Sequence, residues 1–158
     1  MAGAVERFEE AARAAGLSLE IRRFPSGTRT AIDAARAIGC DVGQIVKSLV
    51  FMADGEPFLA LTSGSNLADQ FRLAPLLGAT EVRRATANEA REATAFSIGG
   101  TPPIGHPRPL AALVDRDLLG YEVVWAAAGT PHAVFPIAPA ELAELAGGRV
   151  VRLAAPAR

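Results

Sequence analysis

Residues 45–61 read IVKSLVFMADGEPFLAL, and this stretch decides the fold. It contains two apolar runs, 45–52 and 57–61, that are separated by Ala-Asp-Gly-Glu at 53–56. Asp-Gly between two such runs is a strong signal for a β-hairpin, because a tight hairpin turn needs residues that accept positive φ. We therefore predict two paired strands joined by a short turn, with Lys47 at the start of the first strand.

Lys47 is the only lysine in a chain that carries fifteen arginines. A lysine side chain offers a compact point charge with three rotatable donors, whereas the guanidinium of arginine is a planar fork that needs more room. A buried or phosphate-facing position beside a reacting group favours the smaller cation. Composition alone leaves open the alternative that a single lysine has survived by chance at a strand end.

The remaining elements follow from periodicity and end signals. Helical spacing with capping residues predicts helices over 3–15, over 31–38 after Thr30, from Ser65 or Asn66 to 77, over 86–93 and over 139–146. Short apolar or alternating runs predict strands at 19–24, around 114, and at 123–127, 133–137 and 150–151. The strands lack the regular strand, helix, strand period of a doubly wound fold. We therefore expect a mixed α/β fold of the α+β type, with a largely antiparallel mixed sheet or open barrel and peripheral helices.

The length bounds the number of domains. The chain has 158 residues, half of them apolar, which suffices for one sizeable core, so we expect a single domain over residues 1–158. No apolar run reaches the length of a membrane span, and charges between residues 6 and 10 interrupt the place of a signal peptide. The single cysteine, Cys40, cannot form an intramolecular disulfide, which fits a reducing compartment. The expected location is the cytoplasm, with no membrane contact.

The net charge of −1 argues against a protein that coats nucleic acid by bulk electrostatics, so no DNA partner is expected. Any contact with nucleic acid must be local. The adjacent basic pairs Arg22-Arg23 and Arg83-Arg84 flank apolar segments. They are either solvated strand ends or points of contact with phosphates.

A second feature is the loop at 98–107, which reads IGGTPPIGHP. Paired glycines let the backbone approach a ligand closely, and paired prolines stiffen the return. Backbone N–H groups that converge on one point bind an anion or stabilise a developing oxyanion. Alone, the pattern fits an ordinary turn equally well. Together with Lys47 it becomes a candidate site.

A third stretch of small residues, AGTPH at 128–132, follows an apolar strand. It fits a tight turn, or a loop in which Gly129 leaves space for a substrate backbone and Thr130 or His132 donates to it. Neither His106 nor His132 has a carboxylate partner fixed by local sequence, so each is expected to be a surface residue or a loop-orienting residue and not a general base.

Several other kinds of site are not supported. One cysteine and two distant histidines give no metal-binding set, and no cofactor is expected. The segment 43–48 lacks the glycines of a phosphate-binding loop, although it ends in Lys-Ser. The serines at 63–65 lack the glycine spacing of a nucleophile elbow.

Four motifs occur in a recognisable order: TRTA at 28–31, QIVKSLVF at 44–51, GGTPPIGH at 99–106 and AGT at 128–130. In this order they resemble the YbaK/ProX family of trans-editing domains. These domains are free-standing relatives of the editing domain inserted in bacterial prolyl-tRNA synthetase. The resemblance spans about residues 8–153.

The resemblance implies an aminoacyl-tRNA deacylase, which hydrolyses the ester of a small wrong amino acid on tRNA for proline. Lys47 is similar to the family's strand lysine, which holds the phosphate and ribose end of the acceptor adenosine. Gly99 and Gly100 resemble the start of a loop whose amides face the scissile carbonyl, and Gly129 resembles a glycine of the same pocket. The same motifs carry the other candidates for substrate contact, Thr28, Thr30, Ser48, Thr101, Pro102, Pro103, His106 and Thr130.

The implied chemistry needs no catalytic triad. An aminoacyl ester is already activated, so orientation and oxyanion stabilisation suffice while water or a substrate group attacks. One methylene is worth only ~1–3 kcal/mol, so the prolyl ester must be excluded by shape. The alanine-specific branch carries asparagine after the lysine, where this chain has Ser48. Alanine is therefore not singled out, and cysteine, serine, threonine or a small non-protein amino acid stay open beside it. Prolyl-tRNA synthetase is a candidate partner for tRNA selectivity.

Two alternative functions remain. In one, the chain binds a nucleotide or the acceptor end of tRNA, or modulates a synthetase, without turnover. In the other, Lys47 is the nucleophile of a Schiff-base enzyme, which requires a carbonyl substrate and a lysine of depressed pKa.

Overall fold

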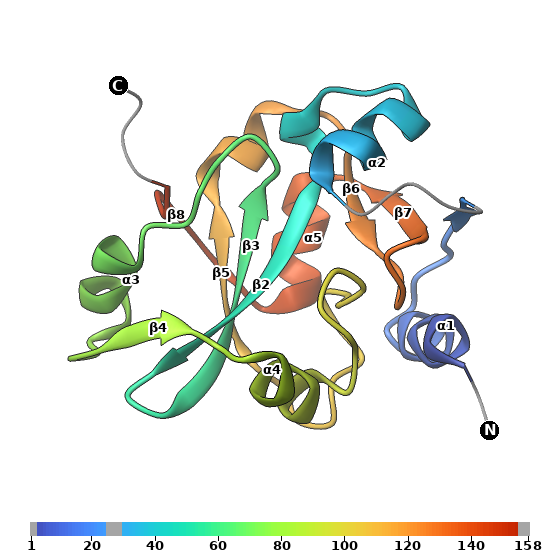
Figure 1. The fold of residues 1–158 in the computed structure, drawn as a ribbon. Helices are drawn as coiled ribbons and strands as arrows, with labels where there is room; N and C mark the ends of the chain where they lie inside the picture. The colour runs from blue at the N-terminus through green and yellow to red at the C-terminus, as the bar shows by residue number, and fades with distance from the viewer. Residues whose placement is uncertain (1–2, 25–29, 155–158) are drawn as a thin grey trace.

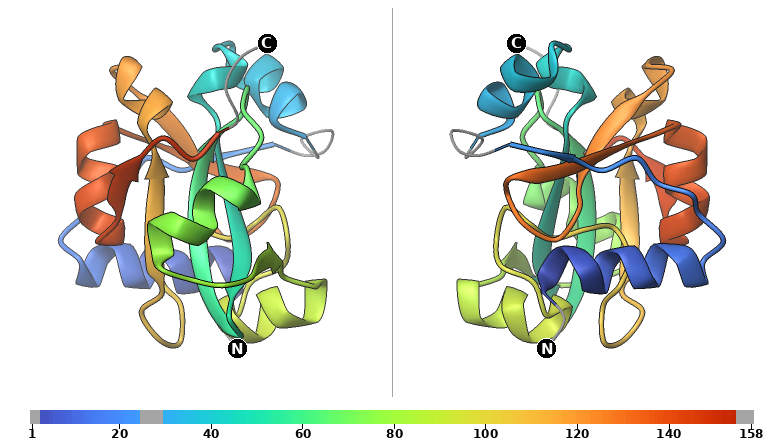
Figure 2. Two further views of the ribbon diagram at one scale, coloured as in Figure 1. Left: turned by 90° about the vertical axis from the view of Figure 1, so that its left-hand side faces the viewer. Right: turned by 90° about the vertical axis from the view of Figure 1, so that its right-hand side faces the viewer.

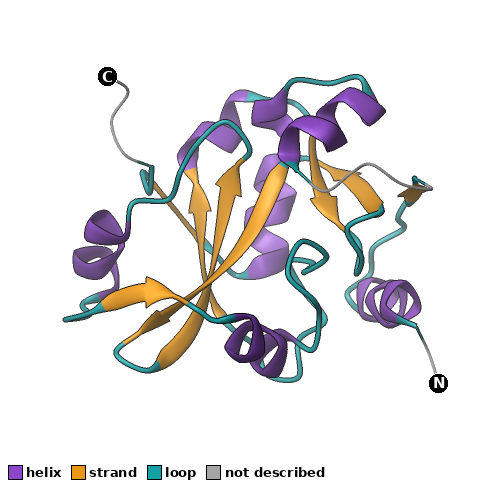
Figure 3. Ribbon diagram, in the orientation of Figure 1, coloured by secondary structure: helices purple, strands orange, loops and turns teal. Residues whose placement is uncertain are grey.

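The computed structural model describes residues 3–24 and 30–154. In that part of the chain the helices are α1 (Ala4–Ala14), α2 (Ala31–Ile38), α3 (Gln70–Leu77), α4 (Ala87–Thr94) and α5 (Pro139–Ala146), with short 3₁₀ helices at Val42–Gln44 and Arg116–Gly120. The strands are β1 (Arg22–Arg23), β2 (Val46–Ala53), β3 (Glu56–Ser63), β4 (Val82–Arg84), β5 (Ala111–Asp115), β6 (Val124–Ala127), β7 (Ala133–Ile137) and β8 (Arg149–Val151). Figure 1 labels these elements, and Figure 3 separates helices from strands by colour.

The predicted hairpin is confirmed. Strands β2 and β3 pair antiparallel along their whole length, and Asp54 and Gly55 both take positive φ at the turn. This hairpin lies at the centre of a five-stranded sheet of order β4-β2-β3-β5-β8, in which β5 and β8 run parallel to their neighbours. A three-stranded antiparallel sheet, β1-β7-β6, stands beside it, and a parallel bridge between Ile45 and Trp125 links the two sheets. The predicted mixed α/β class is therefore confirmed.

Hydrophobic residues pack on both faces of the large sheet. On one face, helices α1 and α5 and the small sheet share a core that includes Phe8, Phe135 and Leu142. On the other face, Leu73 of α3 packs against Phe51 in a second cluster. Figure 2 shows α3 and α1 on opposite sides of the molecule. The large sheet is therefore buried on both faces. Polar side chains along β2 are exceptions in this setting and call for an explanation.

Local end signals placed most helices correctly. Thr30 caps α2 by accepting a hydrogen bond from the Asp33 N–H, and Thr86 and Glu89 form the predicted capping box of α4. Pro139 occupies the first turn of α5, as predicted. In the described part of the chain, no helix is both long enough and apolar enough to cross a bilayer.

Two predicted boundaries were wrong. Helix α3 begins at Gln70 with Asp69 as its cap, not at Ser65 or Asn66, because the Asn66 side chain is engaged elsewhere in the fold. The strand predicted over 19–24 shrinks to Arg22–Arg23, where the chain pairs with β7. Leu19 and Ile21 still pack against the core. Their alternation in the sequence therefore reflects burial of the side chains and not pairing with a neighbouring strand.

Candidate functional site

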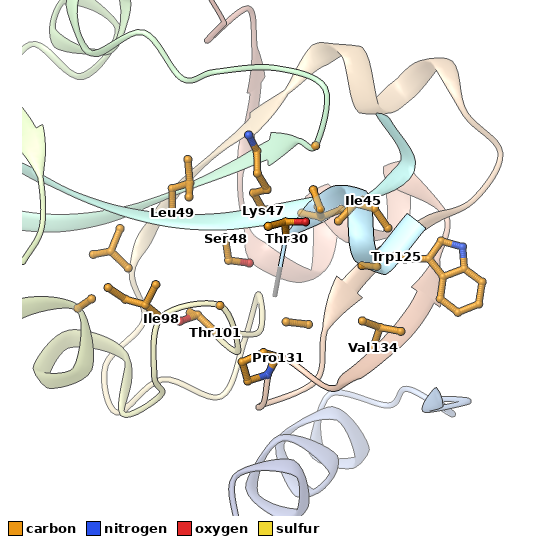
Figure 4. Close-up of a pocket in the computed structure, with 18 of the residues that line it drawn as sticks. Thr30, Ile45, Lys47, Ser48, Leu49, Ile98, Thr101, Trp125, Pro131 and Val134 are labelled. Carbon is orange, nitrogen blue, oxygen red and sulfur yellow. The ribbon is translucent and has the colours of Figure 1, made fainter. Parts of the chain in front are cut away.

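A cavity of about 450 Å³ opens beside the first half of β2. Its walls come from the start of α2, the loop at 98–101, strand β6 and the turn before β7. Thr30, Ser48, Ile98, Thr101, Trp125 and Pro131 are among the residues that line it, and Figure 4 shows their side chains. Segments distant in sequence thus form one concave surface of mixed apolar and hydroxyl character, which suits a small substrate group.

Neighbouring residues of β2 point to opposite sides, as the strand geometry requires. Ser48 projects toward Thr101 and Ile98, whereas Lys47 and Leu49 project from the other side of the strand (Figure 4). The pairing register agrees, since Ser48 lies opposite the core residue Leu61. Ser48 therefore stands on the side of β2 that faces the cavity, and the ammonium of Lys47 lies across the strand.

Lys47 is partly buried, and its Nζ donates a hydrogen bond of 2.5 Å to the backbone carbonyl of Asn66. Burial lowers the pKa of Lys47, the nearby guanidinium of Arg84 lowers it further, and Asp115 acts in the opposite direction. Arg84 also lines the cavity and places its guanidinium 5.4 Å from the centre of the Phe51 ring. Lys47 and Arg84 therefore both belong to the lining of the cavity, and the charge of Arg84 acts on the ammonium of Lys47.

A buried carboxylate fixes the partner of Lys47. Asp115 is 1% exposed, and its Oδ2 accepts hydrogen bonds from the Ser63 N–H at 3.0 Å and from the Asn66 side-chain amide at 2.8 Å. The same amide also donates to Asp117 at 2.8 Å. Oδ1 of Asp115 accepts from the Asp117 N–H at 3.0 Å. Asn66 is thus held in place, and its carbonyl presents a defined acceptor to Lys47.

Ser48 carries a buried hydroxyl without a hydrogen-bond partner among the described residues. A buried hydroxyl that makes no hydrogen bond costs free energy, so such groups are rare in native proteins. Because this hydroxyl borders the cavity, a ligand there is the natural source of its missing partner.

The loop at 97–101 forms the wall of the cavity opposite β2. Gly99 takes φ +89° and packs near Pro131, and both residues line the cavity. Gly100 donates its N–H to Ser97 within the turn, so this amide is already used. A Cβ on Gly100 would come within 2.6 Å of the Thr130 Cα, so the loop is packed tightly against the turn at 128–131.

Behind this wall, His106 holds the loop in shape. Its Nε2 donates to the Pro102 carbonyl at 2.9 Å, since a carbonyl can only accept. Burial lowers the pKa of His106 and so favours the neutral ring, while the hydrogen bond to Pro102 acts in the opposite direction. Pro102 and Pro103 are buried. His106 is thus committed to the loop at this nitrogen.

A match to the family model of the aminoacyl-tRNA editing domain covers residues 25–145. The chain belongs to this family. A solved structure of a candidate trans-editing enzyme for prolyl tRNA synthetase is 45% identical, covers 99% of both chains and superposes with a TM-score of 0.93. The resemblance to YbaK/ProX proteins is therefore confirmed.

Two curated relatives of the editing domain differ in length. The uncharacterized protein YwhH of Bacillus subtilis (strain 168) is 27% identical over 132 residues, which is 83% of each chain. The proline–tRNA ligase of Streptococcus mutans is 33% identical over 110 residues. That match covers 68% of this chain and 18% of the ligase. The chain therefore spans less than a fifth of that ligase and most of YwhH.

The fold brings part of the predicted set to the cavity. Lys47, Ser48, Thr30, Gly99 and Thr101 line it. The residues that stand outside this lining and support the loops are Gly100, Pro102, Pro103, His106, Gly129 and Thr130. Thr28 lies outside the described residues.

Gly129 takes φ +113°, and a Cβ there would come within 2.6 Å of the Ala4 carbonyl. This glycine is therefore needed where the turn packs against the start of α1. Thr130 accepts a hydrogen bond from the His132 N–H at 3.3 Å within the same turn.

Some residues that line or support the cavity had not been predicted from the sequence. Ile32 and Trp125 line the cavity, and Ile32 is 55% exposed at the first turn of α2, where its apolar character was the only available signal. Asn66 and Asp115 are 49 residues apart, so no local pattern could join them. Among the described residues, no cluster of three or more histidines, cysteines or carboxylates could hold a metal ion.

Proposed function

We propose that this editing domain is a deacylase that acts in trans on tRNA for proline charged with a small wrong amino acid. The unit that carries the activity is the whole chain, residues 1–158. The observation that carries the proposal is the cavity, whose lining includes the cations Lys47 and Arg84 and the glycine loop. Family membership supports the same conclusion.

The proposed reaction is hydrolysis of an ester. A water oxygen bonds to the carbonyl carbon, the bond from that carbon to the ribose oxygen breaks, and the ribose oxygen leaves with a proton. Lys47 and Arg84 hold the phosphate of the terminal nucleotide, and the backbone at Gly99 and Thr101 faces the carbonyl as negative charge develops. Because the ester is intrinsically reactive, orientation and charge stabilisation supply the catalysis.

Ser48 supports a finer proposal about the amino acid removed. Its buried hydroxyl gains a partner when the substrate side chain carries a hydroxyl or thiol, and it stays unpaired when that side chain is a methyl group. A site built to hydrogen-bond a substrate group rejects analogues that lack it. We therefore expect serine, threonine or cysteine to be removed faster than alanine, and proline to be excluded by the apolar walls.

The test is deacylation of tRNA for proline charged separately with alanine, cysteine, serine, threonine or proline. The wild type should hydrolyse one or more of the non-prolyl esters, and Lys47→Ala should abolish hydrolysis without loss of fold. Ser48→Ala should narrow the difference between serine and alanine. If Lys47→Ala still hydrolyses these esters, the site assignment is wrong. If the wild type hydrolyses none of the esters, a binding module without turnover is favoured.

One observation favours a second candidate. The lowered pKa of Lys47 is a property of Schiff-base lysines. Against it, Nζ is hydrogen-bonded to the Asn66 carbonyl and lies across β2 from Thr101 (Figure 4). Borohydride trapping of a covalent adduct with a small aldehyde would support this second candidate.

The proposed partner for tRNA selectivity is prolyl-tRNA synthetase, because similar sequences occur within proline–tRNA ligases. Addition of the synthetase should then increase the preference for tRNA of proline over other tRNAs that carry the same amino acid. An unchanged preference would remove this partner from the proposal.

A further inference from the structure

Two large apolar side chains are mostly exposed near the N-terminal end of α3. Leu67 is 80% exposed and Phe71 is 82% exposed, more than any other large hydrophobic side chain in the described part of the chain. They lie four residues apart, on the segment that leads from β3 into the first turn of α3. The same helix buries Leu73 completely, so α3 docks firmly while it leaves Phe71 in solvent.

The segment that carries Leu67 is tied to the cavity. Gly64 lines the cavity, and the carbonyl of Asn66 accepts the hydrogen bond from Lys47. Leu67 is therefore the next residue after the one that positions the candidate catalytic lysine. Figure 1 shows this stretch running from the end of β3 across to α3. A chain-like ligand whose end is held at Lys47 can follow it toward Phe71.

The surroundings of Phe71 are rich in arginine. Arg72 follows it on α3, Arg149 donates a hydrogen bond to the Leu76 carbonyl at the end of the same helix, and Arg152 precedes Leu153, whose carbonyl accepts from the Asp69 N–H. None of these arginines forms an ion pair within the described residues.

The acidic groups of this region have other partners. Asp69 caps α3 by accepting from the Phe71 N–H, and Asp117 accepts from the Asn66 amide. Helix α3 itself carries no acidic residue. Asp69 and Asp117 keep their negative charges, and the three arginines outnumber Asp69 around α3.

We propose that the segment from Leu67 to Phe71 is a stacking platform for the unpaired 3′ nucleotides of the tRNA substrate. This inference rests on the proposed function. Proteins bind single-stranded nucleic acid by stacking bases on aromatic side chains beside positive charges that follow the backbone. Phe71 supplies the ring, Leu67 supplies an apolar contact for the neighbouring base, and Arg72 and Arg152 face the phosphates.

A single-stranded RNA fits this surface better than a folded protein does. A stable protein interface buries about 800 Å² on each partner and involves roughly 20–30 residues a side. Two exposed apolar side chains offer much less apolar area than that, whereas one exposed aromatic ring near arginines is what a base of a single strand stacks on.

The test is binding of a fluorescein-labelled, uncharged RNA hairpin that copies the acceptor stem, with and without its unpaired 3′ nucleotides. Phe71→Ala should weaken binding of the RNA with the overhang about tenfold and leave binding of the blunt RNA unchanged. Phe71→Trp should restore binding. Val123→Ala, which truncates another exposed side chain away from this surface, is the matched control. Arg72→Gln should weaken binding and reduce its dependence on salt.

Equal binding of the overhang RNA by the wild type and Phe71→Ala would overturn the proposal, as would equal binding of the overhang and blunt RNAs by the wild type. If Leu67→Ala and Phe71→Ala instead weaken association with prolyl-tRNA synthetase while RNA binding is unchanged, the surface is a protein-docking site and the proposal is wrong. Because the RNA is uncharged, this test does not depend on hydrolysis. Overhang-specific binding by a wild type that hydrolyses no ester would refute the proposed function alone.

Discussion

Replacement of Asp115 by asparagine should weaken both the fold and the site. The carboxylate accepts three hydrogen bonds, from the Ser63 N–H, the Asn66 side chain and the Asp117 N–H. Asparagine has nearly the same shape but offers one oxygen, and its amide nitrogen can only donate. In the better orientation, the oxygen keeps the bonds to Ser63 and Asn66, and the new amide faces the Asp117 N–H. One donor is then left unpaired in this orientation, and two in the other.

The magnitude follows from this count. A hydrogen bond to a charged group contributes about 1.5–3 kcal/mol, and the two bonds that survive become weaker neutral bonds. Removal of a buried charge offsets part of the loss, because the neutral amide is easier to bury. We expect the free energy of unfolding to fall by about 2 kcal/mol. Urea denaturation followed by circular dichroism measures the change directly.

The same substitution tests how Lys47 is positioned. In the variant, the bond from the Asn66 side chain to residue 115 becomes a weaker neutral one, so the Asn66 carbonyl is held less firmly against Nζ. Deacylation by Asp115→Asn should therefore be slower than by the wild type even at low temperature without urea, where the variant is fully folded. Wild-type stability together with wild-type kcat/KM in Asp115→Asn would refute the reasoning, because it would show that the carboxylate holds neither the fold nor Asn66.

Three further changes have defined outcomes. The pKa of Lys47 is lower in the folded state, so the unfolded chain binds more protons between the folded pKa and 10.5. The free energy of unfolding of the wild type should therefore rise with pH across that window. Denaturation curves of Lys47→Met should lack this rise. Gly100→Ala should destabilise the protein by about 1–3 kcal/mol in urea, because its Cβ meets the Thr130 backbone, which cannot move aside cheaply. Contact with Arg83 lowers the pKa of Glu89 to about 2. The stabilisation from Glu89 is therefore present above pH 4.5 and lost as the pH falls toward 2, and Glu89→Gln should flatten the stability curve in that range.

Signals confined to a few residues predicted much of the fold. The Asp-Gly turn specified the hairpin of β2 and β3 because φ must be positive there. Thr30 and Thr86 marked helix starts because each side chain satisfies an N–H within three residues. The predicted start of α3 was wrong because a contact between residues distant in sequence overrode a local signal. The Asn66 side chain could cap a helix, but its amide donates hydrogen bonds to the carboxylates of Asp115 and Asp117, which lie far along the chain.

The candidate site could be predicted only in part for the same reason. Lys47 and the loop at 99–103 stood out through composition and local pattern, and Lys47, Gly99 and Thr101 do line one cavity. The side of β2 from which Lys47 projects depends on which face of the strand meets the core. That choice is made by Leu61 and its neighbours, and local sequence at Lys47 does not contain it.

The surroundings of Lys47 explain why this position does not follow the chain's preference for arginine. The guanidinium of Arg84 already lies close by, and it contacts the face of Phe51. A second planar guanidinium would need more room than the partly buried position offers, and it cannot lose its charge when it is desolvated. A lysine fits because its single ammonium reaches one fixed acceptor, the Asn66 carbonyl, and keeps two further N–H donors for a ligand. Lys47 therefore supplies hydrogen bonds in a defined direction, whereas Arg84 supplies positive charge. A change of Lys47 to arginine removes the directed hydrogen bonds and leaves the positive charge unchanged.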